Sequence, residues 1–209
     1  MAQIVGLRMP TSGICLFDAS TQDSGVLTQE NYGLGFYSTY YEKNTILKSG
    51  IIKFIVNKET IYKLIMFDHL VYNKDRNPGN LLVEFKAKSI YLTVIDHSHV
   101  FKNQTIWDKQ CFKQGIEDND FLDTDIMEYN DVLYSMFYRN ISFTKELLME
   151  CGNAFKKTLT AEILSNIISK VPSAWGVGND DLKALKEYIV YRLNHIEEIC
   201  DMIITFIRR

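Results

Sequence analysis

The chain has few cysteines, and none of them forms a C-x-x-C pair. The four are widely separated, at Cys15, Cys111, Cys151 and Cys200. Zinc ribbons hold their metal with closely spaced cysteine pairs, so this spacing argues against such a site. Small secreted proteins that depend on disulfides are richer in cysteine, and we therefore expect a reducing, cytoplasmic environment.

Long apolar runs and a basic charge excess are also absent. No apolar run approaches the roughly 18 residues that a membrane-spanning helix needs. The N-terminus lacks the basic start and long apolar core of a secretory signal, so we expect none. The formal net charge is −3 and the sequence pI is about 5.8. With no general basic field, we expect neither a membrane partner nor direct nucleic-acid binding.

The stretch with clear chemical content is residues 67–101. It contains Asp75, then Asn80 after four intervening residues, then an apolar run that ends at Asp96. Phosphoryl transfer needs a carboxylate that orients the attacking hydroxyl, and carboxylate and amide oxygens that hold Mg²⁺ against the nucleotide phosphates. The order and spacing predict Asp75 as the catalytic residue, with Asn80 and Asp96 as catalytic metal ligands.

The local pattern predicts how these three side chains meet. Residues 59–72 have apolar residues at helical spacing, and Pro78-Gly79 marks a loop soon after them. Residues 81–85 and 90–95 are short strand-like runs that we expect to form a hairpin. A helix, a loop and a hairpin in this order would bring the three residues to one cleft.

Outside this stretch the signals are weaker. Residues 13–18 predict a strand, and residues 20–50 predict a polar linker, because the Gly33-x-Gly35 pair lacks the strand and helix that would flank a phosphate-binding loop. The acidic residues 107–125 predict a solvated loop. From Asp131 onward helices are predicted, the last of them a long helix that begins after the cluster at residues 179–181.

Several polar residues around the loop have more than one interpretation. His97 and His99 would share a face if their strand continues, and without further ligands we expect them to line the cleft rather than to bind zinc. Asp68 either orients the loop from behind or ends the helix. Arg76 suits a carboxylate or a phosphate, because its guanidinium donates two parallel hydrogen bonds. We take Asn73, Arg76 and His97 as candidate nucleotide contacts.

The same residues carry a family resemblance. The pattern from Asn73 through Asn80, followed by Ile95-Asp96, resembles the catalytic loop of HipA-like kinases and, more distantly, of phosphatidylinositol 3- and 4-kinases. The resemblance extends to residues 6–10, 35–38 and 172–175. It implies an α+β, mostly helical fold, the large C-terminal lobe of a protein-kinase-like domain with a small catalytic β-hairpin. It also implies ATP and Mg²⁺ as cofactors.

Two parts of a kinase are missing from the sequence. There is no Gly-rich phosphate loop and no lysine where the small lobe would supply one, since Lys43, Lys48 and Lys53 come too late. We therefore expect residues 1–50 to be a remnant of the small lobe and the linker between lobes, and residues 51–209 to be the helical lobe. An apolar patch near residues 7–16 would then be exposed where the small lobe docks.

The expected function is ATP-dependent phosphoryl transfer to a Ser or Thr hydroxyl of a protein. A lipid kinase shares the loop, but an acidic chain is poorly suited to anionic membranes. A catalytically incomplete pseudokinase or binding module is a second alternative. A third is one half of a split kinase, or of a toxin–antitoxin-type system, whose small lobe comes from a partner chain. The sequence leaves open whether the chain is an active enzyme alone.

Overall fold

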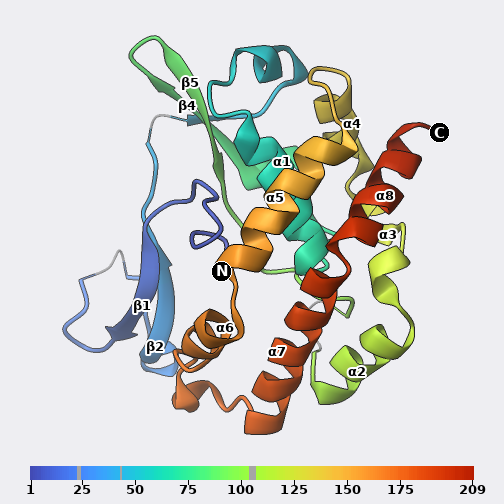
Figure 1. The fold of residues 1–209 in the computed structure, drawn as a ribbon. Coiled ribbons are helices and arrows are strands. Elements are labelled where there is room, and N and C mark those ends of the chain that lie inside the picture. Colours follow the sequence, from blue (N-terminus) through green and yellow to red (C-terminus); the bar gives the residue numbers. More distant parts are fainter. Residues whose placement is uncertain (23–24, 43, 104–106) are drawn as a thin grey trace.

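The computed structural model describes residues 1–22, 25–42, 44–103 and 107–209. Within these ranges a helical body carries two small antiparallel sheets, one of two strands and one of three (Figure 1). The prediction of a mostly helical α+β fold is confirmed. No helix in the described part of the chain is long and apolar enough to cross a membrane. Lys43, considered above, lies outside the described residues.

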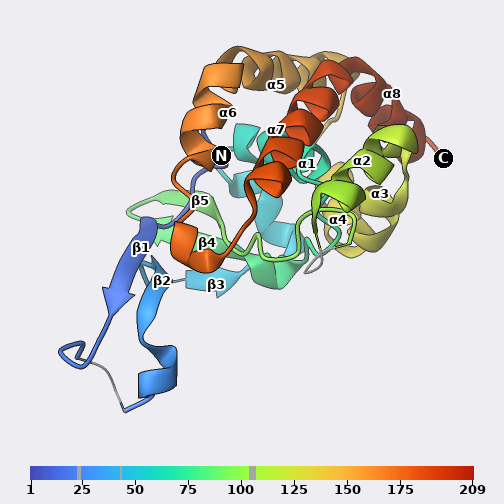
Figure 2. The ribbon, with the colours of Figure 1, turned by 90° about the horizontal axis from the view of Figure 1, so that it is seen from below.

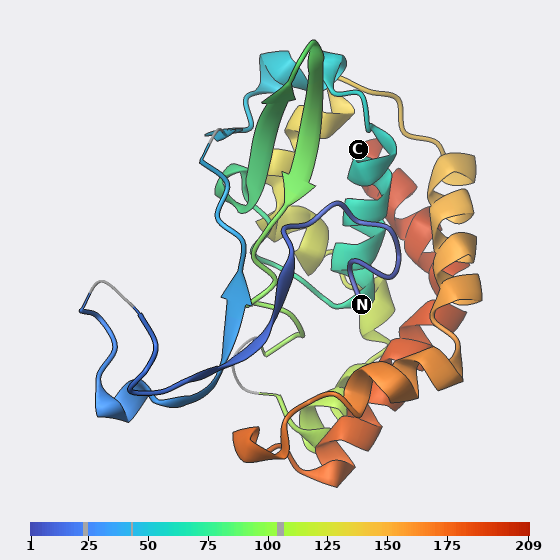
Figure 3. The same cartoon turned by 90° about the vertical axis from the view of Figure 1, so that its left-hand side faces the viewer.

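Helix α1 (Glu59–Leu70) runs through the middle of the body. Its apolar side chains surround the helix, and Ile61, Leu64 and Ile65 are fully buried, as expected of a helix covered on every side. Helices α5 (Lys145–Thr158) and α7 (Asn179–Asn194) pack on one side of α1, and the β4–β5 hairpin lies on the other (Figure 3). The helix is two residues shorter than predicted.

The predicted hairpin is present as β4 (Leu81–Lys86) and β5 (Ser89–Val94), with Leu81 opposite Val94. Alternate residues of a strand share a face, and on one face of β4 Leu81 and Val83 are fully buried while Phe85, nearer the turn, is exposed. Strand β3 (Asn44–Ile46) pairs with the outer edge of β4. The hairpin is therefore fixed to the core at the end that leads into the catalytic loop.

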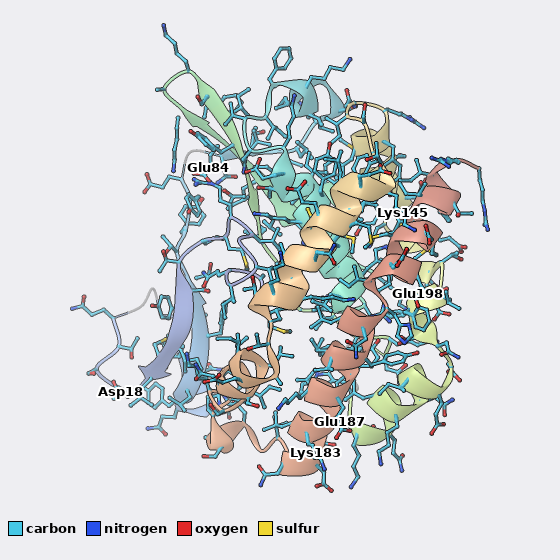
Figure 4. The ribbon with its side chains drawn as sticks, viewed as in Figure 1. Asp18, Glu84, Lys145, Lys183, Glu187 and Glu198 are labelled. Atoms are coloured by element: carbon cyan, nitrogen blue, oxygen red, sulfur yellow. The ribbon has the colours of Figure 1, made fainter. Side chains whose placement is uncertain are left out.

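Strands β1 (Ser12–Phe17) and β2 (Gly33–Ser38) form a separate ribbon that projects from the helical body (Figure 2). Asp18, directly after β1, lies toward its outer end (Figure 4). The linker prediction is wrong for residues 33–38. Gly35 lies under the ring of Phe17, where a Cβ would come within 2.4 Å of the ring. The glycine thus serves strand packing, a requirement that the sequence pattern did not reveal.

The acidic stretch after residue 107 is not a solvated loop, and that prediction is wrong. Helix α2 (Lys109–Glu117) begins there, with the Asp108 carboxylate accepting hydrogen bonds from the first turn's backbone N–H groups. Phe112 packs in the core, and Asp120 is buried in an ion pair with Arg192 of α7. Arg192, 72 residues later in the sequence, neutralises the carboxylate of Asp120, one of the acidic residues that had suggested solvent exposure.

The predicted single final helix is two helices. After α7, the chain turns at His195 and continues as α8 (Ile196–Ile207). The remaining α-helices are α3 (Asp125–Tyr129), α4 (Asp131–Tyr138) and α6 (Ala161–Ile168). Short 3₁₀ turns occupy Gln29–Asn31, Ser49–Phe54, Pro78–Asn80, Asp120–Leu122 and Ser173–Trp175.

Candidate active site

The catalytic loop between α1 and β4 is anchored by the carboxylate of Asp68, near the end of α1. Asp68 and Arg76 form an ion pair, with 3.0 Å between Oδ2 and Nε, and both side chains are fully buried. Asn73 Nδ2 and the Tyr134 hydroxyl each donate to the same carboxylate at 2.9 Å. Of the two roles considered for Asp68, the structure shows the one in which it orients the loop from behind.

Arg76 also connects the loop to the end of the hairpin. Its Nη1 donates to the backbone carbonyls of Ile95, at 2.7 Å, and Asp96, at 3.0 Å. Burial disfavours the charged guanidinium, but the adjacent Asp68 carboxylate outweighs burial and raises the pKa of Arg76. Arg76 therefore remains charged and joins α1, the loop and the residue after β5 into one unit.

A second support comes from Asn130, at the junction of α3 and α4. Its Oδ1 accepts from the backbone N–H of Arg76, and its Nδ2 donates to the carbonyl of Asn73, both at 2.8 Å. Asn130 is buried, so these bonds are protected from competition with water. The catalytic loop is thus held at both its start and its middle.

Asp75 lies at the exposed surface of this loop. Its backbone N–H donates to Oδ1 of Asn73 at 3.0 Å, and its carbonyl accepts from Nδ2 of Asn80 at 2.7 Å. Its side chain is 44% exposed, with Oδ2 lying 3.4 Å from Nδ1 of His99. A carboxylate on a rigid backbone that still faces solvent can accept the proton of an incoming hydroxyl.

Asn80 and Asp96 each keep one side-chain oxygen uncommitted. Asn80 uses Nδ2 for Asp75, and Asp96 uses Oδ1 to accept from the backbone N–H and hydroxyl of Ser98, at 3.0 and 2.6 Å. The Ser98 hydroxyl is the main reason that the pKa of Asp96 is lowered. Oδ1 of Asn80 and Oδ2 of Asp96 accept no hydrogen bond from the described residues, so both can face a cation.

This donor set fits Mg²⁺. Magnesium takes oxygen ligands and is usually held by one or two protein groups together with substrate phosphates and water. Among the described residues, no group of three or more His, Cys, Asp or Glu side chains could hold a metal ion by itself. An amide oxygen from Asn80 and a carboxylate oxygen from Asp96 match a metal that arrives with a nucleotide.

The backbone around Asp96 brings it close to the loop. Asp96 has a φ of +54°, a left-handed conformation that is uncommon for residues other than glycine. The backbone N–H of Ile95 donates to the carbonyl of Asn80 at 3.0 Å, and Arg76 holds the carbonyls on either side of the kink. The hydrogen bonds around Asp96 fix this conformation, which redirects the chain away from β5.

A cavity of about 990 Å³ adjoins Asp96. Its lining includes Asp96, His97 and Ser98, together with Pro10 and Phe36. The His97 ring packs edge-on against Phe67, with 5.4 Å between the ring centroids. Burial, with a further contribution from the Arg76 guanidinium, lowers the pKa of His97 to about 4, so its imidazole is neutral at physiological pH.

The structure joins Asp75 and Asn80 by one direct hydrogen bond, and it connects Asp96 to them indirectly, through the backbone of Ile95 and the side chain of Arg76. It places Asn73 and Arg76 differently: both are buried, with their polar atoms bonded to protein groups. Contact of these two with a nucleotide stays a prediction, and their position favours a supporting role. Sequence reasoning missed Asn130 and Tyr134, because only the tertiary fold brings α3 and α4 to the loop.

A half-exposed carboxylate and an amide oxygen on the loop after α1, followed by a second carboxylate just after β5, stand in the order expected of a kinase-type phosphotransferase site. The family model for HipA-like kinases matches residues 1–201 of the 209. The chain therefore belongs to the HipA-like kinase family, and the resemblance noted from the sequence is confirmed. A comparison with curated proteins finds no significant match.

Proposed function

We propose that this chain transfers the γ-phosphoryl group of Mg-ATP to a Ser or Thr hydroxyl of a protein. The observation that carries the proposal is that Asp75 and Asn80 share one loop, which Arg76 and Ile95 connect to Asp96, and that Asp96 lines a cavity of about 990 Å³. Family membership supports kinase-type phosphoryl transfer in general. The identity of the donor and of the acceptor is the part that we propose.

In the proposed mechanism each of the three residues has one task. The Asp75 carboxylate orients the acceptor hydroxyl and takes up its proton as the new P–O bond forms, while the bond from the γ-phosphorus to the β–γ bridging oxygen breaks and ADP leaves. Asn80 and Asp96 would hold Mg²⁺, which when bound neutralises charge on the phosphate oxygens. Asp68 and Arg76 keep these groups at fixed separations, and such positioning supplies much of what a protein contributes to phosphoryl transfer.

The cavity next to Asp96 supports a nucleotide as the donor. Its volume falls at the upper end of the range for small-molecule sites, and its walls are largely apolar, as suits a flat base. It is formed by the N-terminal segment, the base of the β1–β2 ribbon and residues 95–101. A base in this cavity would direct its phosphates toward Asp96, and His97 would line the wall beside it.

A protein acceptor fits the charge of the chain better than a lipid. The formal net charge is −3, which disfavours docking on anionic headgroups. The proposal includes a cytoplasmic location, because the proposed phosphoryl donor, ATP, is available there.

We also propose a partner chain that supplies a small lobe. The sequence has no Gly-rich loop or suitably placed lysine, and one face of the β1–β2 ribbon is an exposed apolar surface. Its side chains, with exposed fractions of 44%, 63%, 41% and 66%, are Ile14, Leu16, Leu34 and Phe36. The predicted patch at residues 7–16 is thus shifted, since Leu7 is buried.

The test uses radiolabelled ATP offered to the chain with cytoplasmic extract in one sample and with anionic vesicles in another. We expect label in protein bands, and a decrease of about 10²-fold or more for Asp75→Asn. The matched control is Asp180→Asn, an exposed carboxylate at the far end of α7 that should leave transfer unchanged. Label in lipid and in no protein band would contradict the proposed acceptor.

The partner is tested separately, by calorimetry of Mg-ATP binding and by transfer assays on the isolated chain. We expect weak binding and slow transfer, because the covering amides and the lysine supply much of the electrostatic stabilisation in kinases. Micromolar affinity with robust transfer would show that no further lobe is needed. Binding with no transfer under any condition would favour the pseudokinase.

A further inference from the structure

The two histidines after β5 point to different places. Sequence spacing would have put them on one face had the strand continued, but β5 ends at Val94 and the left-handed Asp96 redirects the chain. His97 packs against Phe67, and its Nε2 is buried without a hydrogen-bond partner among the described residues. His99 turns toward the catalytic loop instead, with Nδ1 3.4 Å from Oδ2 of Asp75.

The hydrogen bonds around His99 determine which ring nitrogen carries the proton. The Ser98 hydroxyl has a single hydrogen, and its 2.6 Å contact with Oδ1 of Asp96 requires that hydrogen, because the carboxylate can only accept. The Ser98 oxygen, 3.0 Å from Nδ1 of His99, must then accept from the imidazole. Nδ1 therefore carries the hydrogen and donates it to Ser98, and the same nitrogen lies 3.4 Å from Oδ2 of Asp75.

Few other groups restrain the Asp75 carboxylate. Besides His99, its nearest donor is Nδ2 of exposed Asn77, 3.5 Å from Oδ1. The contact of 3.4 Å with His99 is long for a hydrogen bond, but catalytic contacts are often long before substrate binds and shorten in the loaded site. Because Ser98 fixes the orientation of the His99 ring, the imidazole would hold the Asp75 carboxylate in one rotamer.

We propose that His99 is a positioning residue that holds Asp75 for catalysis and links it, through Ser98, to the metal-binding carboxylate of Asp96. The inference rests on the proposed function, because Asp75 and Asp96 have the roles assigned there. A chain of contacts from Asp96 through Ser98 and His99 to Asp75 couples the metal position to the orientation of the acceptor hydroxyl. Supporting contacts of this kind keep a catalytic side chain in the orientation that the reaction requires.

The first test is independent of activity. Long-range ¹H–¹⁵N NMR at about pH 8.5, where imidazoles are neutral, reports the tautomer of each of the four histidines. His99→Asn identifies the His99 signals by their loss. We expect the Nδ1–H form for His99 in the wild type and in Ser98→Ala, because Asp75 still accepts. In Ser98→Ala/Asp75→Ala we expect reversion to Nε2–H, the form that histidine prefers in water.

The second test is kinetic and uses the full chain, with its partner where one is required for transfer. His99→Leu should lower kcat by about tenfold or more, with the KM for nucleotide within about twofold of wild type. His99→Asn, whose amide can donate from nearly the position of Nδ1, should restore kcat to within about threefold. His195→Leu, at the distant junction of α7 and α8, is the matched control and should change neither constant.

The outcomes separate this inference from the proposed function. An Nε2–H tautomer in the wild type, or reversion in Ser98→Ala alone, would show that His99 does not donate to Asp75 and would overturn the inference. So would His99→Leu with unchanged kcat, or with an effect on KM alone. If no variant transfers phosphate but the tautomers are as expected, the proposed function fails while the contact between His99 and Asp75 stands.

Discussion

Replacing Arg76 with methionine tests whether the buried ion pair holds the catalytic loop. The substitution leaves the Asp68 carboxylate fully buried without its cation, at a site where it loses donors at 3.0 and 3.1 Å. The carbonyls of Ile95 and Asp96 lose a partner as well. Breaking a buried pair in this way typically costs about 3–5 kcal/mol. Asn73 and Tyr134 still donate to Asp68, so we expect a loss near the lower end.

The assay is urea unfolding followed by tryptophan fluorescence and far-UV circular dichroism, with the m-value checked for constancy. The control is Lys145→Met (Lys145 is labelled in Figure 4), which removes two surface ion pairs between α5 and α8 and should leave the midpoint nearly unchanged. Asp68→Asn/Arg76→Met should recover roughly 1–2 kcal/mol relative to Arg76→Met, because no unpaired charge remains. A cost below about 1 kcal/mol for Arg76→Met would refute the reasoning.

Three further predictions address the packing, the pH dependence and the metal. Gly152→Ala should destabilise the fold by about 1–3 kcal/mol in the same urea assay, because its Cβ would lie 2.3 Å from Ile196, whereas Gly50→Ala, in open space, should not. Burial, with the Arg192 guanidinium second, lowers the pKa of His69 to about 3, so the unfolded state binds the proton first and stability should fall as pH drops from about 6.5. Below that pH, the free energy of unfolding should fall by about 1 kcal/mol less per pH unit in His69→Leu than in the wild type, and unfolding of both proteins across this pH range measures the difference. Asp96→Ala should weaken Mg²⁺-dependent nucleotide binding at least about tenfold in calorimetry with and without chelator, and equal affinities would contradict its role.

The central part of the fold could be predicted because its signals are local. Residues 59–72 are strongly apolar at helical spacing, and the two runs after the Pro78-Gly79 loop are of strand length with a short polar connection. The structure has α1, β4 and β5 within one or two residues of those positions. These elements place Asp75 and Asn80 on the loop and Asp96 just after β5, and the roles of the three residues stay predictions.

The failures occur where partners are distant in sequence. Helix α2 has few buried residues of its own, and its packing depends on α7, some 70 residues later. The glycine at position 35 made strand β2 resemble a linker in the sequence. The structure shows why glycine is there, because the Phe17 ring occupies the space that a side chain at position 35 would need. No local pattern encodes either requirement, so composition suggested solvent exposure in both cases. The same limit hid Asn130 and Tyr134 from the predicted site.

Of the three proposed site residues, Asp96 lines the cavity, whereas Asp75 and Asn80 are not among its lining residues, and this bears on how much the chain can do alone. Asp75 and Asn80 are held by bonds that lead to Asp68, Asn130 and Ile95, all within the helical body and its hairpin. The cavity is also lined by the N-terminal segment and by the projecting β1–β2 ribbon, whose apolar face is exposed. A two-stranded ribbon is only marginally stable without further packing. The loop should therefore be formed in the isolated chain, while nucleotide affinity depends on what covers the ribbon.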